Sequence, residues 1–318
     1  MKAPDRTIAE WRLRTRALEL GRRTLVMGVV NITPDSFSDG GRFLDPEAAV
    51  THALRLLDEG ADILDLGAES TRPGSRAGGA AGSEVAPAVS AEEEQARLLP
   101  VLEGILAARL QAIVSVDTYK AATARAAIAA GAEIINDVSG LRWDSGMAAV
   151  CGGFKCGVVL MHTRGRPEDW RTQPQLAPDE LLAAVRSGLA ASLAAAVHVG
   201  IAMESVVLDP GYGFGKRFDE NYALLARQAE LLSLGRPLLA GLSRKSFLGR
   251  TLAPLYAGTT PNAESVAFAP VEAREAASLA ALVAAILHGA SIVRVHAVRT
   301  AVEAALIADA VLGAHRIT

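Results

Sequence analysis

The side chains best suited to chemistry in this chain follow directly after short apolar runs. Eight such runs are followed by these groups: Asn31; Glu69, Thr71 and Arg72; Asp117; Asn136 and Asp137; Met161 and His162; Asp209; Ser243, Arg244 and Lys245; Arg294 and His296. Taken singly, each group has a structural explanation, since Asp117 or Asp209 can cap a helix and Met161 is typical of a core. Their repetition at corresponding positions indicates one shared site.

The basic members of this set predict an anion site. If they meet in one cavity they form a strongly cationic cup, which attracts phosphate or pyrophosphate because arginine binds such oxygens in bidentate fashion. The members of this cup are Arg72, Arg244, Lys245, Arg294 and His296. Alternate residues of a strand face one side, so Arg294 and His296 are expected to point together and Val295 away from them. A buried structural Arg–His pair is the alternative.

The acidic and amide members predict a second binding capability. Asp117, Asn136 and Asp209 suit a flat heterocycle with an amino–imino edge, through paired hydrogen bonds, and Lys245 can meet its carbonyl edge. Phe214 is expected to line the same pocket, within a glycine-rich segment that lets the backbone approach a ligand. The predicted anion site and the predicted heterocycle site together suggest a ligand with an aromatic ring and an anionic leaving group.

The elements that must position these groups alternate along the chain. We expect strands at Leu25–Val30, Ile63–Leu66, Ala112–Val116, Glu133–Ile135, Gly157–Met161, Ser205–Leu208, Pro237–Ala240 and Ile292–Val295. We expect helices at Pro46–Glu59, Ala91–Arg109, Lys120–Ala130, Ser145–Val150, Pro178–Val199, Asn221–Leu232, Arg274–His288 and Ala301–Leu312. Several of these helices end in a glycine–alanine step, which is typical of a glycine C-cap before a buried strand. Eight such units predict an α/β fold with a single (β/α)₈ TIM barrel, in which all the strand ends share one mouth. A doubly wound sheet is the alternative.

The barrel is expected to fill residues 24–318, after an N-terminal extension of residues 1–23 that covers the closed end. Arginines between Arg12 and Arg23 predict a solvated helix in that extension. Two βα loops, after Asn31 and at Ser70–Ser90, are long, and their glycine and proline content predicts mobility.

Composition excludes several classes of protein. The chain has 318 residues and a net charge of −3, which argues against a nucleic-acid partner. Cys151 and Cys156 have no further soft ligands nearby, so they are interpreted as free thiols in a reducing cytoplasm. The apolar stretch Ala276–Val293 is interrupted by His288 and Gly289, which favours a helix followed by a strand over a membrane span.

Seven motifs place the chain beside a known family. They read MGVVNITPDSFSDGG, GADILDLGAESTRPG, VDTYK, IINDVSG, LDPGYGFGK, GLSRKS and IVRVH. With these motifs the chain resembles the dihydropteroate synthases from about Thr24 to about Leu312. The resemblance implies a TIM barrel that condenses 6-hydroxymethyl-7,8-dihydropterin diphosphate with para-aminobenzoate to give 7,8-dihydropteroate and pyrophosphate in folate biosynthesis. Sulfonamides compete with para-aminobenzoate in this family.

The resemblance also implies roles for individual residues. The pterin contacts would be Asp117, Asn136, Asp209 and Lys245, with Met161 and Phe214 against its faces. The diphosphate contacts would be Asn31, Arg72, Arg294 and His296, with Asn31 acting through Mg²⁺. The para-aminobenzoate site would be bordered by Thr71, Pro73, Lys245 and Ser246, with Asp35 and Phe37 closing over it, and Ser243 and Arg244 would lie beside the substrates. The implied mechanism is dissociative, with pyrophosphate leaving before the amine attacks, and a homodimer through the last helices is expected.

Three features depart from the family pattern. The second loop carries extra residues from about Ser75 to Val89, Tyr119 stands where a small residue is commoner, and Ala68 replaces glycine. The alternatives are a methyltetrahydrofolate-dependent methyltransferase, a non-catalytic pterin-binding paralogue, and a Schiff-base aldolase that uses Lys245.

Overall fold

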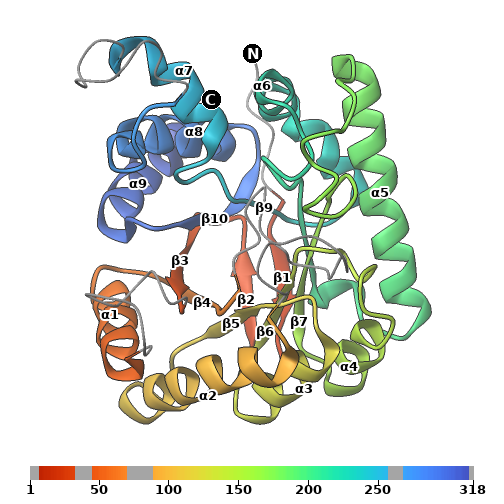
Figure 1. The fold of residues 1–318 in the computed structure, drawn as a ribbon, viewed down its shortest axis with the longest axis vertical. Helices are drawn as coiled ribbons and strands as arrows, with labels where there is room; N and C mark the ends of the chain where they lie inside the picture. Colours follow the sequence, from red (N-terminus) through yellow and green to blue (C-terminus); the bar gives the residue numbers. More distant parts are fainter. Residues whose placement is uncertain (1–6, 33–44, 70–88, 257–267, 315–318) are drawn as a thin grey trace.

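Eight parallel strands close into a barrel surrounded by helices (Figure 1). The computed structural model describes residues 7–32, 45–69, 89–256 and 268–314. Around the barrel the strands follow the order β10-β3-β4-β5-β6-β7-β8-β9. Their bounds are β3 Leu25–Asn31, β4 Ile63–Gly67, β5 Val114–Asp117, β6 Ile134–Asp137, β7 Gly157–Met161, β8 Val206–Asp209, β9 Leu238–Ala240 and β10 Ala290–Val295. The predicted (β/α)₈ barrel is confirmed.

The helices form the outer ring of the barrel (Figure 1). They are α1 Pro46–Asp58, α2 Ala91–Ala108, α3 Ala121–Ala129, α4 Met147–Phe154, α5 Pro178–His198, α6 Phe218–Ala226, α7 Ser246–Tyr256, α8 Glu275–Leu287 and α9 Val298–Ala314, with short 3₁₀ turns η1 Met203–Ser205, η2 Gln228–Leu234 and η3 Glu272–Arg274. The sequence did not predict α7, whose Gly249 and Pro254 weaken its helical pattern. The predicted helix Asn221–Leu232 is wrong in part, because the chain changes there from α6 to the 3₁₀ turn η2.

Local signals explain where several helices begin and end. Asp45 caps α1 by accepting a hydrogen bond from the Glu47 N–H, and Pro46 occupies the first turn, where it costs no hydrogen bond. Ser90 caps α2 in the same way. At the other end of α1, Gly60 has φ +106°, the left-handed conformation that glycine adopts without a steric cost. The predicted glycine caps are therefore present.

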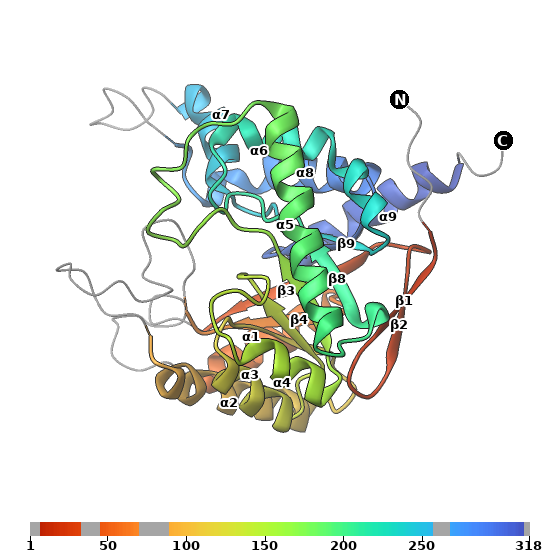
Figure 2. The same cartoon turned by 90° about the vertical axis from the view of Figure 1, so that its right-hand side faces the viewer.

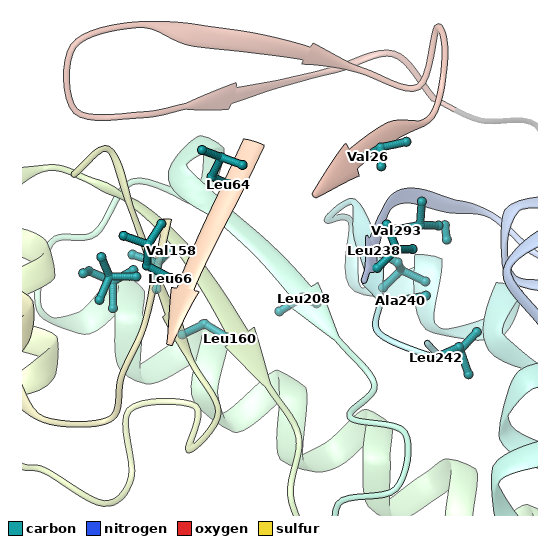
Figure 3. Close-up of a cluster of buried hydrophobic side chains, with 14 of the residues drawn as sticks. Val26, Leu64, Leu66, Val158, Leu160, Leu208, Leu238, Ala240, Leu242 and Val293 are labelled. Atoms are coloured by element: carbon teal, nitrogen blue, oxygen red, sulfur yellow. The ribbon is translucent and has the colours of Figure 1, made fainter. Parts of the chain in front are cut away.

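Strand alternation divides the barrel residues into two sets. Outward residues such as Leu64, Leu66 and Val158 pack between the strands and the helices (Figure 3). Val295 belongs to this outward cluster, as expected. The residues that alternate with these along each strand point into the barrel, so their polarity determines which ligands the interior can bind.

The amino end of the barrel interior is apolar and closed. Inward residues of the strands form one cluster with Trp11, Leu13 and Leu20 of the N-terminal segment, and the strand members are Leu25, Met27, Ile63, Ile134, Val159, Val207, Leu239 and Ile292. The N-terminal segment is an antiparallel hairpin of β1 Ala9–Arg12 and β2 Ala17–Leu20, which Figure 2 shows across this end of the barrel. The Trp11 indole N–H donates to the Ser205 carbonyl at 2.9 Å.

The predicted N-terminal helix is therefore wrong. The hairpin residues alternate between buried and exposed with a period of two, and the arginines lie on the exposed side or in loops. Trp11 is fully buried and fixes the hairpin against the barrel. Basic residues alone did not distinguish a helix from a hairpin, because both leave charges in solvent.

Two apolar segments have the length or composition of a membrane span. By those criteria α5 could cross a membrane, yet its residues Leu181, Val185 and Leu189 belong to the core of this fold. The stretch Ala276–Val293 divides into most of α8 and the first part of β10, as predicted. Cys151 and Cys156 are buried and free, also as predicted.

Replacing Trp11 with alanine tests the role of the hairpin. We expect Trp11→Ala to lower the free energy of unfolding by about 3–5 kcal/mol, because it leaves a cavity under the barrel and removes the bond to Ser205. Denaturant unfolding measures this change. Ile8→Ala, at a side chain 52% exposed, is the control and should change it by less than about 0.5 kcal/mol. An unchanged midpoint for Trp11→Ala would show that the hairpin does not stabilise the barrel.

Candidate functional site

A polar layer lies above the apolar floor of the barrel. On four strands the next inward residue after the apolar floor is polar. The pairs are Ile63 and Asp65, Ile134 and Asn136, Val207 and Asp209, and Ile292 and Arg294. On β5 the inward residues are Ser115 and Asp117. Strand register places Asp65 opposite Ser115 and Asp117 opposite Asn136 on neighbouring strands. The structure therefore brings together residues that are far apart in the sequence.

Arg294 is the centre of this layer. Its Nε donates to Asp65 Oδ2 at 2.5 Å, and its Nη2 donates to Asp117 Oδ2 at 2.9 Å. The same Asp65 oxygen accepts a hydrogen bond from the Asn136 amide at 3.0 Å. Arg294 was predicted to belong to a strongly cationic cup, with a buried structural Arg–His pair as the alternative. In the structure two carboxylates compensate its charge.

Asp65 was missed by sequence reasoning. It is fully buried in β4, within the run Ile-Leu-Asp-Leu-Gly. The signal was present, because an acid at an inward position of a buried strand needs a partner inside the barrel. Asp65 lies inside its strand, between Leu64 and Leu66, whereas most of the predicted site residues lie at or after the strand ends.

The environment of Asp117 changes its ionisation. Burial raises the pKa of Asp117 to about 7, the nearby charge of Arg294 opposes the rise, and the negative charges of Asp65, Glu94 and Asp137 add to it. Near neutral pH, Asp117 can therefore accept or donate a hydrogen bond. Asp117 caps no helix, since the residue at the N-cap of α3 is Lys120.

Asp209 lies in a similar environment on β8. Burial raises its pKa, while the hydrogen bond from the Gly211 N–H and the charge of Lys245 oppose the rise. The Gly211 N–H donates to Asp209 Oδ1 at 2.7 Å. Asp209 shapes its own turn and does not cap α6, which begins at Phe218.

Apolar and aromatic side chains cover part of this mouth. Met161 clusters with Tyr119 and Val138, and the rings of Trp143 and Phe214 pack against them. The Lys245 ammonium lies 4.0 Å from the centre of the Phe214 ring. A flat ligand would therefore meet a thioether and a ring beside hydrogen-bonding groups.

Lys216 holds the loop that carries Phe214. Its Nζ donates to the carbonyls of Gly211 at 2.7 Å, His162 at 3.2 Å and Phe214 at 3.3 Å. Burial lowers the pKa of Lys216 to about 7, although the charge of Asp209 opposes this. The loop after β8 is thus joined to the end of β7.

The glycines of this loop serve backbone packing. Gly211 has φ +69°, and a Cβ there would lie 1.9 Å from the His162 carbonyl oxygen. A Cβ on Gly211 would also lie 3.1 Å from Met161 Cγ, and one on Gly213 would lie 3.4 Å from Lys245 Cδ. Gly211 is therefore required where the loop packs on another strand end, and the approach of this loop to a ligand stays a prediction.

Four further predicted residues lie at three places. His296 Nδ1 is 3.0 Å from Ser243 Oγ, which joins the ends of β9 and β10. Ser246 begins α7. Arg244 has φ +60°, and its backbone N–H donates to the Ser278 hydroxyl of α8. It also lines a cavity of about 20 Å³ between β9, β10, α8 and α9. This cavity lies behind the strands and holds about one water, too little for a substrate.

Several predicted residues lie outside the described ranges. They are Asp35, Phe37, Thr71, Arg72 and Pro73, together with most of the extra residues of the second loop. Their roles stay predictions. The neighbouring Glu69 is described, and its carboxylate forms an ion pair with Lys120 at 2.5 Å.

Comparison with known proteins gives a consistent result. The family model described as "Pterin binding enzyme" matches residues 27–296. The dihydropteroate synthase of Bacillus subtilis is 40% identical over 93% of this chain and 91% of its own length. That of Mycobacterium leprae is 42% identical over 91% of this chain and 94% of its own length.

Solved structures agree with these relatives. The dihydropteroate synthase of Xanthomonas albilineans with 4-aminobenzoic acid is 41% identical, with a TM-score of 0.80 over 96% of this chain and 99% of that one. A structure of the same enzyme with 7,8-dihydropteroate is 38% identical, with a TM-score of 0.77 over 95% and 98%. The Yersinia pestis enzyme with a sulfonamide drug is 38% identical, with a TM-score of 0.79 over 96% and 99%.

Gly211 allows a test of the loop packing. We expect Gly211→Ala to destabilise the protein by at least about 2 kcal/mol more than Gly235→Ala, because both sites have positive φ but only Gly211 would meet a carbonyl oxygen. Gly235→Ala has open space around its Cβ and should cost only about 1 kcal/mol. Thermal unfolding of both variants measures the difference, and equal losses would contradict the close approach.

Proposed function

The chain belongs to the dihydropteroate synthase family, and we propose that it condenses 6-hydroxymethyl-7,8-dihydropterin diphosphate with para-aminobenzoate. The products are 7,8-dihydropteroate and pyrophosphate. One observation carries the proposal: Asp117, Asn136 and Asp209 converge in the barrel interior near the wall of Met161, Phe214 and Lys245.

The pterin fits the inward layer chemically. An aminopyrimidinone ring presents N–H donors along one edge and a carbonyl on another. Asp117, Asn136 and Asp209 supply acceptors for the donors, and Lys245 supplies a donor for the carbonyl. Met161 and Phe214 would pack against the faces of the ring, and their burial beside these groups supports this arrangement.

The diphosphate would meet the cationic side of the mouth. Arg294 uses Nε and Nη2 for its bonds to the two carboxylates, so Nη1 lies outside these bonds and can meet the leaving group. His296 follows two residues later on the same face. Arg72 is assigned to this site from the motif alone.

We propose Mg²⁺ as a cofactor shared with the substrate. Mg²⁺ is usually held by one or two protein oxygens together with substrate phosphates and water. Within the described ranges, no cluster of three or more His, Cys, Asp or Glu side chains can hold a metal ion. Asn31 ends β3 at an inward position with one amide oxygen, which suits a cation held jointly with the diphosphate. When bound, Mg²⁺ would neutralise charge on the departing pyrophosphate.

The proposed mechanism is dissociative. Pyrophosphate leaves first, and Arg72, Arg294 and His296 stabilise its charge. The pterin cation is then captured by the arylamine, which Ser246 and the loop residues Thr71 and Pro73 would orient. Exclusion of water by the loops matters, because water would otherwise hydrolyse the cation.

The alternatives are less well supported. A methyltransferase that uses methyltetrahydrofolate has no need for a diphosphate site, yet Asn31, Arg294 and His296 are present. Their presence also argues against a non-catalytic paralogue. An aldolase would require an apolar pocket around Lys245, whereas the Lys245 charge acts on Asp209.

We also propose a cytoplasmic homodimer. The free thiols of Cys151 and Cys156 support a reducing compartment. The last helix, α9, exposes a line of large apolar side chains, and Leu306, Ile307 and Val311 are 61%, 68% and 46% exposed. A second copy of this chain, packed through its own α9, would bury them.

A pyrophosphate-release assay tests the catalytic proposal. We expect release that depends on both para-aminobenzoate and Mg²⁺. Asp117→Ala should raise the KM for the pterin diphosphate at least about tenfold, through a lost hydrogen bond to a charged group. Arg294→Ala should lower kcat at least about a hundredfold, through lost stabilisation of the leaving group.

Arg227→Ala is the matched control, because Arg227 pairs with Asp179 and Glu230 away from the site. Its kinetics should equal those of the parent protein. Wild-type rates in either site variant would refute the assigned roles. Release that does not respond to the amine would refute the synthase proposal.

Charge placed on α9 tests the dimer. We expect Ile307→Glu to shift the protein from dimer to monomer, because a buried unpaired carboxylate is costly at an apolar interface. Sedimentation velocity distinguishes the two states. Leu110→Glu, at a side chain 76% exposed after α2, is the control and should leave the dimer intact. A dimer that survives Ile307→Glu would place the interface elsewhere.

A further inference from the structure

Asp65 is a buried acid that none of the roles above uses. It lies on the inward face of β4, its side chain is fully buried, and it is two residues above the apolar floor residue Ile63. Burying a carboxylate is costly unless charged partners and hydrogen bonds compensate it. The presence of the Asp65 carboxylate inside the barrel should therefore be explained by the groups that it contacts.

Asp65 is a shared acceptor for two predicted substrate contacts. Its Oδ2 accepts from Arg294 Nε at 2.5 Å and from Asn136 Nδ2 at 3.0 Å. These donors come from β10 and β6, on opposite sides of β4 and β5 in the barrel order. One oxygen therefore fixes two side chains that the strand order does not make neighbours.

The bond to Asn136 decides how the amide is oriented. A carboxylate only accepts hydrogen bonds, so the NH₂ group of Asn136 must face Asp65. The Asn136 carbonyl oxygen is then turned away from Asp65 and is presented as an acceptor. A ligand beside Asn136 must match this orientation, which suits an N–H of a heterocycle.

The bond to Arg294 fixes the guanidinium in a similar way. Nε donates to Asp65 and Nη2 donates to Asp117, so two of the three guanidinium nitrogens of Arg294 are fixed. Arginine has several rotatable bonds, and ordering it in advance lowers the cost of binding an anion.

The second oxygen of Asp65 argues against a purely structural ion pair. Asp65 Oδ1 is buried and has no hydrogen-bond partner among the residues that the structure describes. A buried ion pair that serves stability alone requires its remaining lone pairs to be satisfied.

We propose that Asp65 is the positioning residue of the pterin site, which orients the Asn136 amide and the Arg294 guanidinium before the substrate binds. The inference rests on the proposed function, because the roles of Asn136 and Arg294 come from it. Asp65 acts through these two residues and is not itself assigned to the reacting atoms.

The charge of Asp65 also has a consequence for Asp117. The charged groups around Asp117 are Arg294 from β10, Asp65 from β4, Glu94 from α2 and Asp137 from β6. Removing the negative charge of Asp65 makes ionisation of Asp117 easier, so the pKa of Asp117 should fall. Since the ionised form accepts from a ring N–H, the rise of kcat/KM with pH should move to lower pH.

The variant Asp65→Asn tests the proposal. It keeps the shape of the side chain but loses the charge and half of its acceptor capacity. We expect the KM for the pterin diphosphate to rise at least about tenfold, as for a lost charged hydrogen bond. The KM for para-aminobenzoate should stay within about twofold, because only the pterin half of the site is disturbed. The acidic limb of the pH profile should move to lower pH.

Glu133→Gln is the matched control. Glu133 is also a buried acid that pairs with an arginine, Arg16, but it lies just before β6, at the closed end of the barrel. It should keep both KM values and the pH profile of the parent protein. If Asp65→Asn also leaves these unchanged, the positioning role is wrong. If Asp65→Asn raises both KM values equally, Asp65 has only a general structural role and the proposal is again overturned.

A second variant covers the case in which Asp65→Asn does not fold. Removing both partners of a buried ion pair is tolerated better than removing one. Asp65→Asn with Arg294→Met should therefore fold, and its pterin affinity, measured by calorimetry, should be at least about fivefold weaker than that of Arg294→Met alone. Equal affinities would refute the role of Asp65 towards Asn136. A parent protein without amine-dependent turnover would instead refute the proposed function.

Discussion

The buried charge of Asp65 is the constraint on which the polar interior depends. A carboxylate with no solvent contact requires a cation. Arg294 of β10 supplies it to Asp65 of β4, and β3 lies between these two strands in the barrel. Arg294 in turn binds Asp117, and Asp65 also holds Asn136. Four side chains from four strands thus depend on one another, so their geometry is set before any ligand arrives. Preorganised groups of this kind are the usual source of electrostatic catalysis.

Strand alternation explains why this network lies at one end only. The inward positions change from apolar to polar between Ile63 and Asp65 on β4, and between Ile292 and Arg294 on β10. One step of two residues therefore separates an apolar floor from a polar layer. The N-terminal hairpin closes the floor with Trp11, so the interior opens only at the carboxyl ends of the strands. The same strands therefore contribute apolar residues to the core at their amino ends and polar residues to the mouth at their carboxyl ends.

Much of this arrangement could be predicted from the sequence because it depends on local patterns. The strand Gly157–Met161 was predicted at its observed bounds, and the polar residues after each strand indicated the mouth. An acid inside an apolar strand indicated that Asp65 needs a buried partner, but the local pattern could not identify that partner as Arg294, which lies 229 positions away in the chain. The hairpin was mistaken for a helix because Trp11 is ordered by the barrel and not by its neighbours. Contacts between distant segments are the part that local patterns cannot provide.

The hydrogen bond from Trp11 to Ser205 also constrains the order of events during folding. The two residues are 194 positions apart, so the indole reaches its burial site only after β8 has been synthesised and has joined the sheet. Contacts of such long range form late and slow the folding of a domain. The hairpin residues are synthesised before the barrel strands, so their apolar side chains stay uncovered until the barrel closes and can associate with other chains in the meantime. Trp11 is one of three tryptophans in the chain, and its fluorescence should change when the completed barrel buries the indole.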